Sequence, residues 1–197
     1  CRERLEKQIA FIKEIDKVKS IFRRNRLIDD SRYENDAEHS WHLAIMAFIL
    51  CEHANDQKLD VAKVIRMALV HDLVEIGVGD TFIYDLEKRA SKAEEERESA
   101  NRVFGLLPDD QRDALIALWE EFEARQTPEA KFARSLDRIQ PLTHNASTQG
   151  HAWKKHNVKR HQVEAVNRCI EDGSETLWAY AKKELIERSV ANGYLEE

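Results

Sequence analysis

Apolar residues recur at spacings of three and four along most of the chain, which is the pattern of one face of an α-helix. The pattern predicts a first helix over residues 5–22. A second helix is predicted over 35–54, because Asn35 can cap its N-terminus and Glu38 can complete a capping box. Its middle, residues 43–50, is apolar on every side. We therefore expect the second helix at the centre of a helical bundle.

Helical patterns continue through the rest of the chain. Gly77 and Gly79 end the third helix, and Pro108 and Pro128 occupy first-turn positions of later helices. The segment 86–104 is highly charged and predicts a solvated helix or a lid. No strand pattern is longer than four residues. The helices expected after the second one span about 60–76 and 86–104, open at Pro108 and Pro128, and span about 158–171 and 175–191.

The composition fits one helical domain. A chain of 197 residues can bury a substantial core, and this length favours a single domain. Charged residues make up 35 % and apolar residues 42 %, with only six Gly and three Pro. That balance suits helices that pack through apolar stripes and expose charged faces. We therefore expect an all-α fold and a single domain over residues 1–197.

The net charge and the cysteine content limit which binding partners and which cellular compartment are expected. A net charge of −6 gives no broad positive field, so polymeric nucleic acid is not expected as a partner. The longest apolar run, 43–51, is too short to cross a bilayer, and no signal-peptide pattern is found, so no membrane partner is expected. Three separated cysteines without CxxC spacing indicate a reducing cytoplasm. The start at Cys1 instead of Met suggests that a few native residues are missing.

Four polar residues stand where a helical core calls for apolar ones. His71 and Asp72 follow an apolar run, and Asp72 falls on the apolar face of its helix. Asp137 repeats this anomaly in a later helix, and His39 lies in the first turn of the second helix, where a neutral imidazole can point inward. An unpaired carboxylate on a buried face is costly, so it needs a cation or strong donors. Glu75 adjoins this group on the same helix.

Two imidazoles and two carboxylates suit a divalent ion such as Mn, Fe, Co, Ni or Zn, with Mg as a further candidate. Two positions of an octahedron would stay open, one for a water of lowered pKa and one for an oxygen of the scissile group. Each residue alone also has an ordinary explanation. His39 can be a hydrogen-bonded core residue, Asp137 can pair with Arg138 at the surface, and Glu75 can be solvated. His42 and His53 are expected to be packing or surface groups.

The order of these residues resembles the H…HD…D signature of the HD-domain superfamily. The branch that contains bacterial 5′-deoxynucleotidases is the most similar, and the resemblance covers roughly residues 10–170. The strings that carry it are Glu34-Asn35-Asp36-Ala37-Glu38-His39-Ser40, His71-Asp72-Leu73-Val74-Glu75 with Gly79-Asp80, and Asp137-Arg138-Ile139-Gln140-Pro141.

The resemblance implies roles for particular residues. It implies a metal-binding core over about 10–170, followed by C-terminal helices over 174–191. An arginine between the first two helices would bind substrate phosphate; Arg23 is our candidate, with Arg24 and Arg26 as alternatives. The implied ligands of one divalent metal are His39, His71, Asp72 and Asp137, and the implied catalytic residues are Glu75 and Asp80.

The resemblance also implies a reaction. The expected activity is removal of phosphate from a small phosphomonoester, above all a 5′-(deoxy)nucleoside monophosphate. Asp72 or Glu75 would handle the proton of the attacking water, while Arg23 neutralises phosphate charge. Deoxynucleotidases of this branch carry a tryptophan after that arginine, whereas this chain has Arg24, so the sugar preference stays open.

Three alternatives remain at this stage: a nucleoside triphosphate or diphosphate hydrolase, a phosphodiesterase, and a non-catalytic metal or nucleotide sensor. Glu75 and Asp80 favour an enzyme, because metal binding alone does not need them. Relatives imply a homodimer. The expected dimer contact is apolar residues of the C-terminal helices, namely Leu177, Trp178, Tyr180, Leu185 and Val190.

Overall fold

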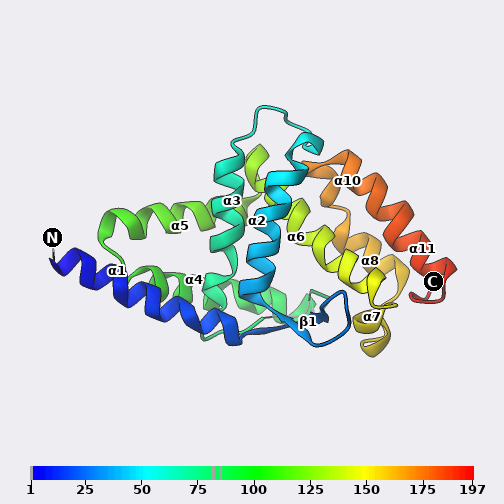
Figure 1. Ribbon diagram of the computed structural model, residues 1–197, viewed down its shortest axis with the longest axis horizontal. Coiled ribbons are helices and arrows are strands. Elements are labelled where there is room, and N and C mark those ends of the chain that lie inside the picture. Colours follow the sequence, from blue (N-terminus) through cyan, green and yellow to red (C-terminus); the bar gives the residue numbers. More distant parts are fainter. Residues whose placement is uncertain (1, 81–82, 85) are drawn as a thin grey trace.

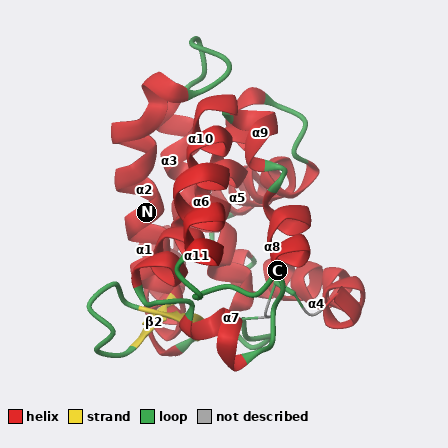
Figure 2. Ribbon diagram, turned by 90° about the vertical axis from the view of Figure 1, so that its right-hand side faces the viewer, coloured by secondary structure: helices red, strands yellow, loops and turns green. Residues whose placement is uncertain are grey.

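The computed structural model describes residues 2–80, 83–84 and 86–197, without the side chains of 86–91. The fold is all-α, as the sequence predicts, with one pair of short strands (Figures 1 and 2). The α-helices are α1 (Arg2–Ile15), α2 (Asp36–Leu50), α3 (Val61–Val70), α4 (Leu86–Phe104), α5 (Asp109–Ala124), α6 (Pro128–Ser147), α7 (His151–Lys155), α8 (Arg160–Asn167), α9 (Ile170–Gly173), α10 (Glu175–Tyr180) and α11 (Arg188–Ala191). Three 3₁₀ segments and one π segment adjoin them: η1 (Asp16–Ser20), η2 (Cys51–His53), η3 (His71–Glu75) and π-helical η4 (Ala181–Glu187).

Helix α6 forms the centre of the bundle. Thr127 caps it by accepting a hydrogen bond from the Ala130 amide, and Pro128 occupies its first turn. Twelve of its 20 residues are buried. It packs against α2, α3, α5 and α9, and Figure 1 shows it running between α2 and the C-terminal helices. Side chains on several faces of α6 are therefore buried in the core.

The expectation that α2 lies at the centre is wrong. Leu43 and Ala47 are buried, but Trp41, Ile45, Phe48 and Ile49 on the other side are 62, 47, 66 and 58 % exposed. An apolar sequence on all sides of a helix does not specify which side meets the core. Among the described residues, α3 and α6 pack against the side of α2 that carries Leu43 and Ala47.

The first predicted helix is shorter than expected. Helix α1 ends at Ile15 and continues as η1, and Phe22 already belongs to a strand. The apolar spacing that predicted this helix runs through Leu5, Ile9, Ile12, Ile15, Val18 and Phe22. Its first three residues are exposed, whereas Val18 in η1 is buried, and the buried residue of α1 itself is Phe11. The spacing thus identified a helix, but Phe11, which lies outside the spacing, contacts Phe104 of α4.

A two-stranded antiparallel sheet lies before α2. Strand β1 (Phe22–Arg26) pairs with β2 (Tyr33–Asn35), and β1 exceeds the four-residue limit that the sequence suggested. Its sequence, FRRNR, lacks the alternation of a half-buried strand, which explains the wrong expectation. The pairing places residues from both strands beside α6 and α2.

Helix α4 matches the predicted span 86–104, and its second half is solvated on one face but buried on the other. Ala100, Val103 and Phe104 are buried in a cluster with Phe11 and Trp119. Helix α7 and the extension of α6 to Ser147 were not predicted; α6 continues through Pro141.

The C-terminal segment 175–191 is helical as predicted, through α10, η4 and α11. Leu177, Trp178 and Leu185 are buried in the chain's own core. These side chains are therefore not available for the expected dimer contact.

Two further observations bear on the compartment. Cys51 and Cys169 are free thiols, whereas Cys1 lies outside the described residues. Within the described part of the chain, no helix is both long and apolar enough to cross a membrane.

Candidate metal centre

The structure brings together the four residues that the sequence singles out as metal ligands. The capping box of Asn35 and Glu38 fixes the start of α2 and thereby the position of His39. His71 and Asp72 follow α3, where the backbone tightens into η3, and Asp137 lies in the middle of α6. The four side chains meet at their tips: His39 Nε2 lies 3.1 Å from Asp137 Oδ1 and 4.0 Å from Asp72 Oδ2, and His71 Nε2 lies 3.1 Å from Asp72 Oδ1 and 3.7 Å from Asp137 Oδ1.

The hydrogen bonds of the two imidazoles suit a divalent cation at this point. His71 Nδ1 lies 2.9 Å from the Ala68 carbonyl, and His39 Nδ1 lies 3.0 Å from Gln140 Oε1. When Nδ1 carries the hydrogen, the lone pair of a neutral ring is on Nε2. Both lone pairs then face carboxylate oxygens, and His71 Nε2 has no hydrogen-bond partner among the described residues. A cation between these atoms would remove the repulsion.

The two imidazoles of the site differ in the direction in which their pKa values are shifted. Burial lowers the pKa of His39 to about 4, and the nearby Arg23 guanidinium acts in the same direction. Burial alone would also lower the pKa of His71, but the carboxylates of Asp72 and Asp137 outweigh it and raise the pKa to about 9. A positive charge is therefore favourable next to the His71 ring, because the carboxylates of Asp72 and Asp137 lie beside it.

The two carboxylate oxygens of Asp137 face different partners. Its Oδ1 faces the imidazoles, whereas Oδ2 accepts a 2.8 Å hydrogen bond from Arg134 and lies 3.6 Å from Arg138. The sequence suggested a surface ion pair with Arg138, but Asp137 is buried. Burial would raise the pKa of Asp137, and the two guanidinium groups hold it well below its usual range. Asp137 therefore stays ionised.

Glu75 is not the solvated residue that the sequence allowed. It is 7 % exposed, and its carboxylate accepts two hydrogen bonds from Lys92 Nζ, at 2.7 and 2.8 Å. Burial raises the pKa of Glu75 and the Asp72 carboxylate adds to this, whereas the Lys92 ammonium group opposes the rise and favours the ionised carboxylate. Lys92 comes from the charged helix α4, where nothing in the sequence distinguishes it from its solvated neighbours.

A cavity of about 260 Å³ opens beside these groups. Arg23 hydrogen-bonds to Asp72 Oδ2 at 2.9 Å and to Asp36 Oδ1 at 3.0 Å. Arg26 instead pairs with Asp30. Of the three candidate arginines, Arg23 and Arg24 line the cavity and Arg26 does not. The charged residues around the cavity are Arg23, Arg24, Asp72, Glu75, Asp80, Lys92, Glu96, Glu123, Arg125, Arg134, Asp137 and Arg138. The sequence reasoning missed the contributions of Arg125, Arg134 and Lys92.

Comparison with known proteins places the chain in a family. The family model described as HD domain matches residues 15–178. The chain belongs to the HD-domain family. Its fold, its site and this match together define an HD-domain protein with a candidate metal centre.

Individual relatives give the same family context. Human 5′-deoxynucleotidase HDDC2 is 35 % identical over 111 residues, which cover 56 % of this chain and 52 % of that protein. The Xenopus laevis protein of the same name is 30 % identical, with 72 % of this chain and 69 % of that protein covered. The chain thus spans about half the length of the human relative that it matches.

A solved structure covers nearly the whole chain. It is described as a predicted metal-dependent phosphohydrolase from Magnetospirillum magnetotacticum MS-1. It shares 51 % sequence identity and a TM-score of 0.92, over 99 % of this chain and 100 % of that chain. At this identity the side-chain arrangement can be compared as well as the fold.

Proposed function

We propose that this protein is a metal-dependent phosphohydrolase that removes phosphate from a 5′-nucleoside monophosphate. The observation that carries this proposal is the convergence of His39, His71, Asp72 and Asp137 beside an arginine-lined cavity. Relatives named 5′-deoxynucleotidase and the phosphohydrolase structure support it. One divalent ion per chain, whose identity the ligand types leave open among Mn, Co, Fe, Ni, Zn and Mg, is part of the proposal.

We assign the roles from position and charge. A divalent ion held by the two imidazoles and two aspartates would polarise a phosphoryl oxygen and lower the pKa of water. Glu75, three residues after Asp72 and lining the same cavity, takes up or returns the proton of the attacking water. Asp80 also lines the cavity and adds a second carboxylate there. Arg23, bonded to Asp72, neutralises phosphate charge.

The substrate class is tested by a phosphate-release screen. The arms are 5′-ribonucleoside and 5′-deoxyribonucleoside monophosphates, a nucleoside diphosphate, a nucleoside triphosphate and a phosphodiester. We expect the monophosphates to be hydrolysed fastest. Turnover of the diester alone, or of none of these compounds by metal-loaded protein, would contradict the proposal.

A second candidate is hydrolysis of a nucleoside diphosphate or triphosphate. Arg24 and Arg125 line the cavity in addition to Arg23. Further guanidinium groups can neutralise further phosphates. Preferential turnover in the diphosphate or triphosphate arms of the screen would favour this candidate.

The buried pair of Lys92 and Glu75 leads to a specific prediction. Lys92 opposes the rise in the pKa of Glu75, so Lys92→Met shifts Glu75 further toward the neutral acid. A neutral acid cannot accept a proton from water. We expect kcat to fall by roughly 10–100-fold, as for other orienting partners of catalytic groups, with metal content unchanged. The control is Lys63→Met, which removes a half-buried lysine that pairs with Glu121 and does not line the cavity. Equal kcat in Lys92→Met and the native protein would contradict this role.

We propose that the protein is a homodimer that associates through α2. Trp41, Ile45, Phe48 and Ile49 follow one another at spacings of four, three and one and form an exposed apolar strip on this helix. Such a strip is costly to leave in water and is typical of a partner interface. A second copy is the occupant, because a twofold interface pairs identical strips.

The dimer prediction is tested by light scattering at micromolar concentration. We expect a mass about twice the 23.0 kDa of one chain. Phe48→Glu should give a monomer, because it places a charge in the middle of the strip. Tyr180→Glu, on the exposed C-terminal surface, is the control and should remain dimeric. A native mass of one chain would contradict the proposal.

We further propose that the protein works in the cytoplasm. The free thiols Cys51 and Cys169 support a reducing compartment. The substrate that the site favours is a small anion, and neither polymeric nucleic acid nor a membrane is part of this proposal.

A further inference from the structure

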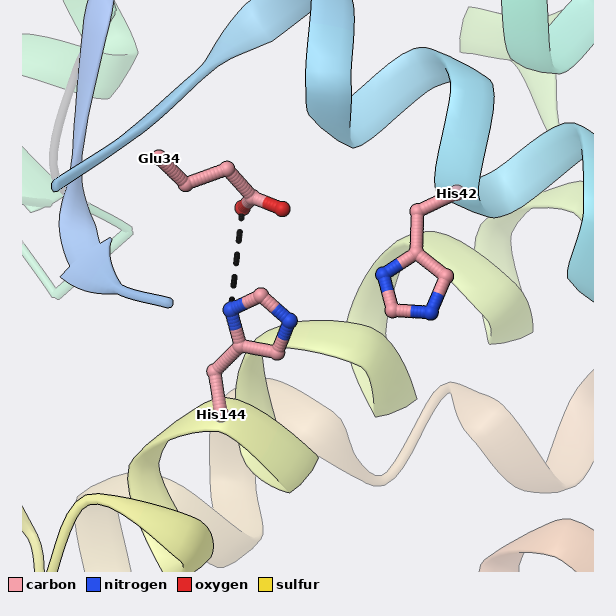
Figure 3. Close-up of side chains that lie close together, drawn as sticks. All are labelled: Glu34, His42 and His144. Carbon is pink, nitrogen blue, oxygen red and sulfur yellow. Dashed lines mark ion pairs between the residues drawn. The ribbon is translucent and has the colours of Figure 1, made fainter. Parts of the chain in front are cut away.

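A second polar cluster lies directly behind His39. It consists of Glu34 on β2, His42 on α2 and His144 near the end of α6 (Figure 3). One ligand-type atom from each lies within 4.8 Å of the others. Glu34 Oε2 lies 3.9 Å from His144 Nδ1, and Glu34 and His144 are buried. His42, which was expected to be a packing or surface group, is half-buried and contacts Gln140.

The amide nitrogen of Gln140 interacts with all three residues. Gln140 Nε2 lies 2.5 Å from Glu34 Oε1, 3.2 Å from His144 Nε2 and 3.3 Å from His42 Nδ1. The other end of the same amide, Oε1, lies 3.0 Å from Nδ1 of His39. Gln140 is itself buried. One amide thus joins the second cluster to a candidate metal ligand.

The chemistry of the three residues determines which end of the amide faces them. An amide nitrogen donates hydrogen bonds and does not accept them, whereas a carboxylate and an unprotonated imidazole nitrogen accept. Burial lowers the pKa of His144 to about 4 and lowers the pKa of His42 as well, so both rings are neutral at pH 7. The Glu34 carboxylate can only accept, and each neutral ring has one nitrogen that can accept, so these neighbours suit the amide nitrogen and not the amide oxygen.

The orientation of the amide in turn decides the tautomer of His39. With Nε2 held by the cluster, the carbonyl oxygen Oε1 must face His39 Nδ1. That oxygen only accepts, so Nδ1 carries the single hydrogen of the neutral ring. The lone pair is then on Nε2, which points to Asp137 Oδ1. A flipped amide would place a donor against Nδ1 and move the hydrogen to Nε2, where it blocks metal binding.

We propose that Glu34, His42 and His144 hold the Gln140 amide in the orientation that prepares His39 to bind a metal ion. Gln140 is thus a positioning residue for a metal ligand, and the three-residue cluster acts through it. This inference rests on the proposed metal centre. The same residue types can bind a metal themselves, but the Gln140 nitrogen already contacts each of them.

The test is titration of metal-stripped protein with Co²⁺, followed by calorimetry and by the visible absorption of the bound ion. Gln140→Met keeps the length of the side chain and removes both ends of the amide. We expect its Co²⁺ affinity to fall by roughly 10–100-fold, the usual effect of losing the hydrogen-bond partner of a metal-binding histidine. Thr143→Val, which removes a hydroxyl from the same helix outside the cluster, is the matched control and should bind as the native protein does.

A reciprocal exchange separates positioning from packing. In the double variant Glu34→Gln/Gln140→Glu, the carboxylate at 140 still accepts from His39 Nδ1, and the amide at 34 donates to it. The neutral rings of His42 and His144 can each present their single N–H to this carboxylate by changing tautomer. We expect this variant to bind Co²⁺ within about threefold of the native affinity, a difference below about 0.7 kcal/mol. Gln140→Glu alone places two carboxylates together and should bind more weakly than the exchange. Melting temperatures of the metal-free variants report any general loss of packing.

Each outcome has a distinct meaning. Native affinity in Gln140→Met would overturn the positioning role while leaving the metal centre intact. A native protein that binds no Co²⁺ would instead remove the metal centre, and the positioning role with it. Binding of two ions, one of them lost in His144→Ala, would make the cluster a metal site and overturn the inference. If the double variant Glu34→Gln/Gln140→Glu does not recover Co²⁺ affinity, Gln140 contributes only through packing.

Discussion

Asp137→Asn is expected to lose both the bound divalent metal and phosphate release. Asp137 Oδ1 faces the Nε2 atoms of both histidines, at 3.1 and 3.7 Å, so its negative charge is central to the proposed ligand set. Asparagine keeps the shape and can still accept from Arg134, but it removes that charge. Alanine would leave Arg134 buried without a partner, which costs roughly 3–5 kcal/mol and risks unfolding.

The measurement for Asp137 combines elemental analysis with a phosphate-release assay on a deoxynucleoside monophosphate. Exposed Asp113→Asn is the matched control, since it removes a carboxylate of the same type far from the cavity; it should keep both properties. Full metal occupancy and native turnover in Asp137→Asn would show that Asp137 is not a ligand.

Glu75→Gln is expected to keep the metal and lose activity. The four proposed ligands are untouched, and the glutamine carbonyl can still accept a hydrogen bond from Lys92, so the buried lysine keeps a partner. What disappears is the ability to take up a proton. A positioned acid or base contributes typically 10²–10⁴-fold, so we expect kcat to fall by roughly that factor.

The comparison of Glu75→Gln with Asp137→Asn separates proton transfer from metal binding. Glu75→Gln should have native metal content and low kcat, whereas Asp137→Asn should be low in both. Glu123→Gln, a carboxylate that also lines the cavity, is the control and should retain most activity. If metal-loaded Glu75→Gln turns over at the native rate, Glu75 has no role in proton transfer.

The candidate ligands could be predicted because each of them breaks a local pattern. His71 and Asp72 end an apolar run, and Asp137 lies one turn from Ala133 and beside Leu136 on a buried helix. A polar residue at an apolar position is visible within one helical segment. Their order along the chain then matched the HD-domain signature, and the family model covers that part of the chain.

The supporting residues could not be predicted, because their burial depends on contacts between distant segments. Lys92 lies among charged residues that resemble it in sequence, and only the packing of α4 against η3 brings it to Glu75. His144 follows Gln140 by one helical turn, but β2 must be present before Glu34 can complete the cluster. The sequence of β1 gave no sign of that strand pair.

The buried and exposed faces of the outer helices α1 and α2 were predicted least well, because they too depend on contacts between distant segments. The apolar pattern identified α1 and α2 as helices but could not assign their covered faces. Phe11 packs on α4 while Leu5 and Ile9 stay exposed, and Phe48 on α2 is exposed as well. Which apolar face is buried depends on the elements that arrive from elsewhere in the fold, and on any partner chain.

We propose that this chain uses a divalent metal, held at the His39, His71, Asp72 and Asp137 site, to release phosphate from a nucleoside monophosphate. Phosphate release by chelator-treated protein, measured before and after stepwise addition of Mn²⁺ or Co²⁺, tests this most directly. We expect no release before addition, and activity that saturates at about one ion per chain. Unchanged release by fully metal-stripped protein, or none from the reloaded protein, would contradict it.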